Sequence, residues 1–241
     1  MNSFPYWHKL PGDLIREQLP LFRWQPEGQD GPATATAALM LYVALIFHTK
    51  SNEMPTSLML EIPTAEVSYS ELQESTGLSR KLIAGGIRRL EASGLVKRTG
   101  NAQKRCYVIR YGNSFSKIPC RPIVRGNRIH PFHQFSLRSK HELYALKLYL
   151  YLLSVRPNEQ RYAQASYEKI YKKTGVPERD IQRAIAHLIN VRLLQTVKRA
   201  EGQAYGPNEY HFYGADLFFT SSYIREAAED GGRQQGLADL L

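Results

Sequence analysis

The most regular feature of the chain is an apolar stripe at helical spacing that occurs twice. Its first occurrence is Ile83, Ile87 and Leu90, which share one face of a helix. The stripe returns 98 residues later, and its neighbours return with it. The positions that coincide without a gap are Ser68, Tyr69, Thr76, Gly77, Ile83, Ile87, Leu90 and Leu95 with Ser166, Tyr167, Thr174, Gly175, Ile181, Ile185, Leu188 and Leu193. This self-similarity predicts two copies of one folding unit.

Each copy is predicted to contain a short helix, a turn and a longer helix. In the first copy, Ser68 and Glu71 form an S-x-x-E capping box that begins the short helix. Gly77 supplies the positive φ that ends this helix, and Ser79 can cap the next one. Gly94 ends the longer helix. In the second copy, Pro177 is expected at the first helical position, where its missing N–H does no harm.

A two-stranded hairpin is predicted to follow the longer helix in each copy. The first hairpin spans Val96–Tyr111, with a polar turn between its strands. The second pairs Leu193–Arg199 with Glu209–Tyr213 across a longer loop. A further strand is expected at Leu58–Ile62, with Pro63 ending it.

An apolar helix is predicted ahead of each copy. The first, Ala35–His48, has a wide stripe and should be the buried first helix of its unit. The second, Glu142–Val155, is expected to begin with a Ser139–Glu142 capping box. Their apolar positions are Leu39, Tyr42, Val43 and Ile46 in the first, and Leu143, Leu146, Leu150 and Leu153 in the second. The repeat is therefore a whole domain.

The stretch Tyr69–Ser93, its Gly94-Leu95-Val96 exit and the hairpin Val96–Tyr111 resemble the winged helix-turn-helix superfamily of DNA-binding domains. The resemblance implies an α+β fold, mainly helical with small β-hairpin wings, in two tandem domains. It also implies that the longer helix of each copy enters the major groove while the wing touches the backbone.

The side of each longer helix opposite the stripe carries cations, amides and small residues. On the first helix these residues are Lys81, Ala84, Gly85, Arg88 and Ala92, and on the second they are Arg179, Gln182, Arg183 and Ala186. Arg and Gln have paired polar atoms that match guanine and adenine edges. An ordinary solvated helix face favours the same residue types, so this alternative stays open.

Two features of these helices bear on whether they contact DNA: a pair of glycines in the first and two acidic residues in the second. Gly85 and Gly86 cost helix propensity, so either DNA or packing against Ala35–His48 or a second subunit requires them. Glu178 and Asp180 lie near the start of the second long helix, where phosphates would repel them. Copy one is therefore the stronger candidate for DNA contact.

The net charge of +10 is concentrated in one part of the chain. From Lys97 to Lys140 there are eleven cations and no Asp or Glu, whereas the rest of the chain carries a charge of −1. Cations that neutralise phosphates release counterions, and this release supplies much of the affinity for DNA. The alternatives are a linker kept basic for solubility, or one that binds an acidic partner or lipid headgroups.

These observations define a set of candidate DNA-contacting residues. The set is Ser79, Arg80, Lys81, Ala84, Gly85, Arg88, Arg89, Lys97, Arg98, Lys104, Arg105, Lys169, Lys172, Lys173, Arg179, Gln182, Arg183, Lys198 and Arg199. Arginines on the long helices are the expected base readers, and the hairpin and short-helix lysines are the expected phosphate contacts.

The expected organisation has five segments. They are an N-terminal extension over residues 1–34, a first domain over 35–115, a basic linker over 116–138, a second domain over 139–215 and a C-terminal tail over 216–241. The extension should contain a short helix at Asp13–Gln18 and pack on the first domain or on a partner. Three prolines predict an extended crossing for the linker. In the tail, Phe218, Phe219 and Tyr223 should dock on the second domain, and residues 226–241 should be mobile or order with a partner.

Several other classes of function lack support in the sequence. No apolar run reaches membrane-spanning length, and the N-terminus lacks a signal-peptide pattern, so we expect a cytoplasmic, nucleoid-associated protein. Cys120, His130 and His133 form an incomplete and cationic metal-ligand set, so we expect no metal and no other cofactor. No phosphate loop or catalytic motif is present, and we expect no enzymatic activity.

Three functions remain, and the first is preferred. The chain is a transcriptional regulator that binds double-stranded DNA through both domains, with a homodimer as a candidate assembly. Alternatively, it is a replication initiator of a plasmid or integrated element, since many such initiators resemble this layout. A third hypothesis is a winged-helix scaffold that binds proteins, and the N- or C-terminal extension could hold such a partner.

Overall fold

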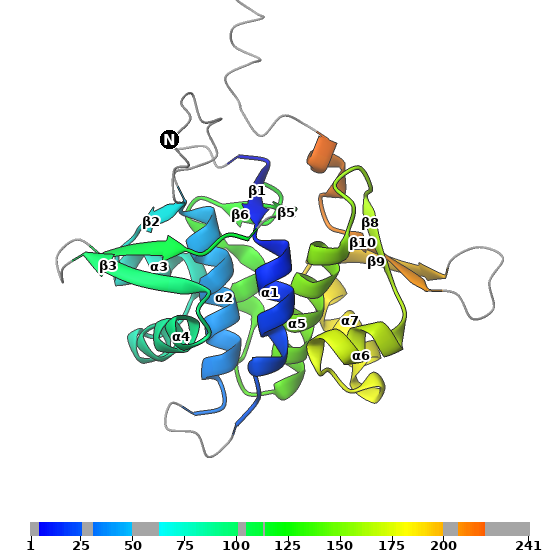
Figure 1. Cartoon of the computed structure of the whole chain (residues 1–241), viewed down its shortest axis with the longest axis horizontal. Coiled ribbons are helices and arrows are strands. Elements are labelled where there is room, and N and C mark those ends of the chain that lie inside the picture. Colours follow the sequence, from blue (N-terminus) through cyan, green and yellow to red (C-terminus); the bar gives the residue numbers. More distant parts are fainter. Residues whose placement is uncertain are drawn as a thin grey trace, which may run out of the picture.

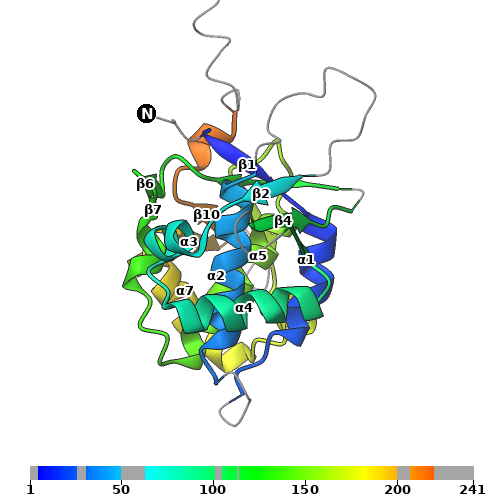
Figure 2. The ribbon, with the colours of Figure 1, turned by 90° about the vertical axis from the view of Figure 1, so that its left-hand side faces the viewer.

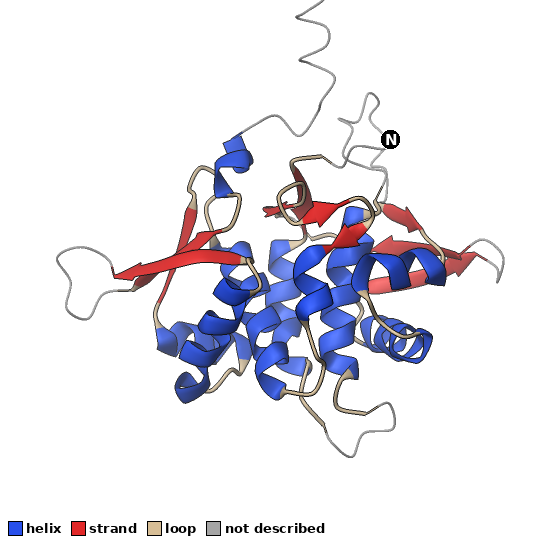
Figure 3. Ribbon diagram, turned by 180° about the vertical axis from the view of Figure 1, so that it is seen from behind, coloured by secondary structure: helices blue, strands red, loops and turns tan. Residues whose placement is uncertain are grey.

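The predicted repeat is present in the three-dimensional structure. A computed structural model describes residues 5–25, 31–49, 63–100, 105–112, 114–199 and 207–219. These residues form seven α-helices and several small antiparallel sheets, an α+β arrangement (Figure 1). The two hairpins extend from opposite ends of the long axis, with the helices gathered between them (Figures 1 and 3).

The two copies contain the same elements in the same order. Copy one consists of α2 (Thr34–Phe47), β2 (Thr64–Glu66), α3 (Tyr69–Thr76), α4 (Arg80–Ala92), β3 (Val96–Gly100) and β4 (Arg105–Ile109). Copy two consists of α5 (Lys140–Val155), β8 (Tyr162–Ala165), α6 (Tyr167–Thr174), α7 (Glu178–Asn190), β9 (Leu194–Arg199) and β10 (Asn208–Phe212). The strand orders also match, β2-β4-β3 in one copy and β8-β10-β9 in the other.

The turn between the short and the long helix has the same hydrogen bonds in both copies. Thr76 Oγ1 donates to the carbonyl of Leu72 at 2.6 Å and accepts from the Leu78 N–H at 3.3 Å. Thr174 makes the same two bonds in copy two, at 2.7 and 3.1 Å. Gly77 follows with a φ of +75°, which confirms the predicted left-handed end of α3, and Gly175 ends α6 in the same way with a φ of +70°.

The helix starts were predicted correctly in copy one and less well in copy two. The Ser68–Glu71 capping box and the Ser79 cap are both present. Pro177, however, is the N-cap of α7 rather than its first residue. The Ser139–Glu142 capping box is wrong, because the Glu142 carboxylate accepts from the N–H and hydroxyl of Ser136 instead, at 2.6 and 3.0 Å.

Each of the two sheets built on a predicted hairpin contains a third strand that the sequence did not reveal. β2 pairs with β4, and β8 pairs with β10, so each hairpin becomes a three-stranded sheet. Pro63 precedes β2, and its carbonyl accepts from the Ile109 N–H at 3.0 Å. The strand expected at Leu58–Ile62 lies outside the described residues.

Helices α2 and α5 form the centre of the molecule. All residues of α2 are buried, which confirms the prediction of a buried helix, and the burial extends beyond the wide stripe expected for it. Helix α4 crosses one side of α2 (Figure 2), while β1 (Trp7–Leu10) and α5 cover other sides. In α5, the predicted positions Leu143, Leu146, Leu150 and Leu153 are all fully buried. The buried apolar residues form one continuous core across both copies.

The N-terminal extension packs at the junction of the two copies. It contains β1, then α1 (Gly12–Gln18), which confirms the expected short helix, and a 3-10 turn at Leu19–Leu21. Helix α1 packs on α5, which belongs to copy two, and β1 pairs with β5 (Ser116–Pro119). The extension therefore joins the copies rather than covering the first alone.

The segment expected to be an extended crossing is folded. Besides β5, it contains the short pair β6 (Val124–Arg125) and β7 (Arg128–Ile129) and a 3-10 turn at His130–Gln134. In the tail, Phe218 is buried within the 3-10 turn Ala215–Phe219, whereas Phe219 is exposed. Tyr223 and residues 226–241 lie outside the described residues.

Candidate nucleic-acid interface

Helix α4 presents cations on the side opposite the core. Ile83, Ile87 and Leu90 are buried, while Arg80, Lys81 and Arg88 are exposed. Ala84 is half-buried. Gly85 is buried, so its predicted outward position is wrong. The exposed surface of α4 is therefore narrower than the sequence indicated and consists mainly of its cations.

The Gly85–Gly86 pair faces the interior of the protein. A Cβ on Gly86 would lie 2.5 Å from Leu41 Cδ1 and 3.2 Å from the backbone nitrogen of Ala38. Both atoms belong to α2. Of the alternatives that the sequence left open, close packing against the first helix is the one that Gly86 serves.

Arg89, another candidate DNA-contacting residue on α4, is hydrogen-bonded to the N-terminal extension. Its Nη2 donates to the carbonyls of Leu21 and Arg23, each at 3.3 Å, and its guanidinium lies 6.0 Å from the ring centre of Phe22. The side chain is held by these contacts, so Arg89 does not belong with the exposed cations of α4.

The cations of the first hairpin differ in how they are held. Lys97 is exposed on β3. Arg98 forms an ion pair with Glu91 at 3.6 Å, and Arg105 stacks on the Tyr69 ring with its guanidinium carbon 3.9 Å from the ring centre. Lys104 lies outside the described residues.

Helix α7 presents the whole polar face that the sequence predicted. Arg179, Gln182, Arg183 and Ala186 are exposed, and Ile181, Ile185 and Leu188 are buried on the other side. Beside it, Lys169 and Lys173 are exposed on α6, and Lys198 and Arg199 are exposed on β9. Lys172 is exposed too, and it forms an i,i+4 ion pair with Glu168 at 2.5 Å.

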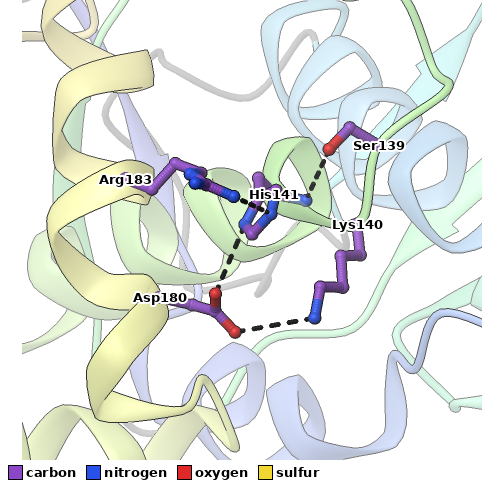
Figure 4. Close-up of polar contacts among 5 residues, drawn as sticks. All are labelled: Ser139, Lys140, His141, Asp180 and Arg183. Carbon is purple, nitrogen blue, oxygen red and sulfur yellow. Dashed lines mark hydrogen bonds and ion pairs between the residues drawn. The ribbon is translucent and has the colours of Figure 1, made fainter.

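The acidic residue Asp180 is buried and is not part of the exposed polar face of α7. Its carboxylate is largely buried against α5, where Lys140 Nζ and His141 Nδ1 each lie 3.7 Å from one of its oxygens (Figure 4). The expected repulsion of phosphate by Asp180 is therefore partly offset by the positive charge of Lys140. Glu178 remains exposed at the start of the helix.

His141 also contacts one of the candidate readers. Its Nε2 lies 2.9 Å from Nη1 of Arg183 (Figure 4). Desolvation, and then the positive charge of Arg183, lower the pKa of His141, and the Asp180 carboxylate only partly opposes this effect. The imidazole is thus neutral at pH 7, and Arg183 can donate to it.

The acid-free stretch does not form one patch beside α4. Its cations follow β3 and β4, continue along β5, and reach the β6–β7 pair, where Arg125 and Arg128 are exposed. Lys117 on β5 donates to the carbonyl of Phe218 at 2.8 Å. Part of the stretch therefore flanks α4, and part of it stabilises the connection between the copies.

The described residues offer no candidate metal centre or membrane span. Among them, no group of three or more His, Cys, Asp and Glu side chains is arranged to hold an ion. Cys120 is buried, whereas His130 and His133 are exposed. None of the helices in the described ranges has both the length and the apolar character needed to cross a bilayer.

Comparison of the chain with protein-family models, curated proteins and solved structures returned no match.

Proposed function

We propose that this chain is a tandem winged-helix protein that binds double-stranded DNA with sequence preference and regulates transcription. The observation that carries the proposal is the exposure of Arg88 on α4 and of Arg179 and Arg183 on α7, with the opposite side of each helix in the core. Both helices follow a short helix and a left-handed glycine, and both precede a sheet with exposed cations. This is the arrangement in which a helix-turn-helix unit reads the major groove.

The two helices would read different bases. Arg183 and Gln182 have the paired polar atoms that match guanine and adenine, respectively, and Arg88 can match a guanine in the other half of the site. Lys97, Lys198 and Arg199 on the hairpins would contact phosphates, which positions the helices without carrying sequence information. The bound site would therefore have two unlike halves.

The unlike halves favour a second candidate function, initiation of replication of a plasmid or integrated element. One continuous core joins the copies, so a single chain presents two different reading surfaces in a fixed relation. Such a chain suits an asymmetric site, and asymmetric sites can be repeated head to tail in an origin. A regulator acting on a palindrome would instead bind as a homodimer, since the symmetry of the site mirrors that of the protein.

Selection of bound duplexes from random DNA, followed by a salt series on the preferred site, tests the proposal. We expect one preferred sequence and a log–log salt slope steeper than about −4, because several phosphates are neutralised. Lack of measurable affinity for any duplex at moderate salt would refute DNA binding and favour the protein-binding scaffold.

Single substitutions distinguish base-specific contacts from sequence-independent attraction to the DNA backbone. Arg88→Ala and Arg183→Ala should each cost roughly 1–3 kcal/mol on the preferred site and little on other sequences. Arg121→Ala is the matched control, since it removes an exposed cation outside α4, α7 and the two hairpins. Equal losses from all three variants on all sequences would contradict reading by the helices.

The form of the preferred site decides between regulation and initiation. Promoter sites with an effect on the adjacent gene support the regulator. Directly repeated sites whose binding melts neighbouring DNA support the initiator, and permanganate reactivity of unpaired thymines would detect that melting.

A further inference from the structure

The contact between His141 and Arg183 gives copy two a feature that copy one lacks. Arg183 extends from α7 and meets the imidazole of His141, which lies on the first turn of α5 (Figure 4). In the aligned positions of copy one, Gly85 stands in place of Arg183 and Leu82 in place of Asp180. The cluster is therefore a property of the second reading surface alone.

The geometry fixes which nitrogen of His141 carries the proton. Nε2 is 2.9 Å from the Arg183 guanidinium, which can only donate, so Nε2 must accept. The ring proton is then on Nδ1, which faces the Asp180 carboxylate at 3.7 Å. Lys140 lies against the other oxygen of that carboxylate. Asp180 thus favours the tautomer that leaves Nε2 free to accept.

We propose that His141, oriented by Asp180, is a positioning residue that holds the Arg183 guanidinium for base reading. This inference rests on the proposed function. One N–H of Arg183 is bonded to His141, and the guanidinium keeps four further N–H donors for a guanine edge. A side chain held in place before binding loses less conformational freedom on contact, so the restraint favours the matched base.

The positioning contact should fail in acid. The charged and titratable groups that face His141 are Asp180 and Arg183 from α7 and Lys140 from its own helix, and the Tyr144 ring lies 6.0 Å away. Protonated Nε2 cannot accept a hydrogen bond, and the imidazolium repels the guanidinium. Because desolvation and the neighbouring cations lower the pKa of His141 below 6.5, the contact persists at neutral pH and is lost below that range.

The first test needs no DNA and follows the His141 ring in the full-length protein by ¹⁵N NMR. We expect a neutral ring protonated at Nδ1 and a pKa below 6.5. Arg183→Ala should raise the pKa of His141, since it removes a cation, and Asp180→Asn should lower it. An ordinary pKa that neither substitution moves would overturn the inference, whatever the protein binds.

The second test uses the selected duplex and a duplex altered at the position that Arg183→Ala identifies. Wild-type protein should prefer the first roughly ten-fold or more at about pH 7.5 and lose most of that preference about one pH unit below the His141 pKa that the ¹⁵N titration gives. His141→Gln keeps an acceptor near the position of Nε2 and does not titrate, so it should retain the preference at both pH values. His141→Phe should lack it at both.

The preference at the base assigned to Arg88 is the internal control and should stay the same in all His141 variants. If His141→Phe reads the Arg183 position as wild type does, the positioning role is wrong while the proposed function stands. If wild type binds no duplex, the proposed function fails, and the ring titration alone decides whether the cluster orients Arg183.

Discussion

At the residue scale, the two copies place different side chains at aligned positions of their long helices. Lys81, Ala84, Gly85 and Arg88 in α4 align with Arg179, Gln182, Arg183 and Ala186 in α7. Helix α4 has its cations at either end of a small-residue stretch, and that stretch is partly buried against α2. Helix α7 has its polar groups in its first half. The same backbone unit therefore offers two distinct surfaces to a ligand.

Gly86 allows α4 to pack closely against α2, and replacing it should destabilise the fold. Gly86→Ala would gain about 1 kcal/mol of helix propensity. The new methyl group would press on Leu41 Cδ1 and on the backbone of Ala37 and Ala38, at 2.5 to 3.3 Å. Overpacking of a dense core costs about 1–3 kcal/mol, so we expect a net loss of stability in urea denaturation.

The same change in a Leu41→Ala background checks this explanation. The leucine methyl that approaches most closely is then absent, so Gly86→Ala should cost less than it does in the wild-type protein. If Gly86→Ala stabilises the wild-type protein by its full helix propensity, the packing explanation is wrong.

At the element scale, the Thr–Gly turn determines how the two helices of each copy meet. The hydroxyl of Thr76 or Thr174 closes the last turn of the first helix and also accepts the N–H two residues later. Both threonines are buried. The turn is thus held by one side chain in addition to the left-handed glycine.

Thr76→Val and Thr174→Val should each destabilise the protein by about 1–3 kcal/mol, because the N–H of Leu78 or Val176 loses its acceptor in a buried site. Valine has nearly the shape of threonine, so packing changes little. Thr→Ser keeps the hydroxyl and should restore most of the stability at each position. Chemical denaturation of the four variants measures the effect, and a Val variant as stable as wild type would refute it.

The elements that the sequence predicted well are those with local signals. Caps, a left-handed glycine and the apolar stripe located α3 and α4 almost to the residue, and Pro177 marked the start of α7 to within one residue. Strands β2 and β8 have three and four residues and depend on partners far along the chain, so no local pattern marked them. The predicted Ser139–Glu142 capping box is absent because the Glu142 carboxylate accepts a hydrogen bond from Ser136, which the preceding turn places beside it. The burial of Asp180 could not be predicted from the local sequence either, because its partners Lys140 and His141 belong to another helix.

At the scale of the whole molecule, a short part of the N-terminal extension fastens the copies together. The carbonyls of Leu21 and Arg23 accept from Arg89 of α4, and the carbonyl of Phe22 accepts from Lys147 of α5 at 3.1 Å. Successive residues of one segment thus bind a helix from each copy. These bonds hold α4 and α5 to one segment, and α7 packs on α5, so they support the relative placement of α4 and α7 on which the proposed two-part DNA site would depend.

Lys147 should make this junction sensitive to alkaline pH. Burial, with help from Arg23 and Arg89, lowers the pKa of Lys147 from 10.5 to about 8 in the folded protein. Below pH 8 the lysine is charged in both states, and the folded state bears the full cost of burying the cation. Between pH 8 and 10.5 the folded state releases the proton and the unfolded state keeps it, so stability rises with pH by at most about 1.4 kcal/mol per pH unit.

Lys147→Met should remove this dependence while filling the same space. The free energy of unfolding of wild type minus that of Lys147→Met should therefore rise by up to about 2 kcal/mol between about pH 7.5 and 9.5, because all other groups cancel in the difference. Lys169→Met, which removes an exposed lysine from α6, should show no such change. A constant difference for Lys147→Met across that range would mean that the buried amine stays protonated there, and that the junction keeps its full positive charge up to about pH 9.5.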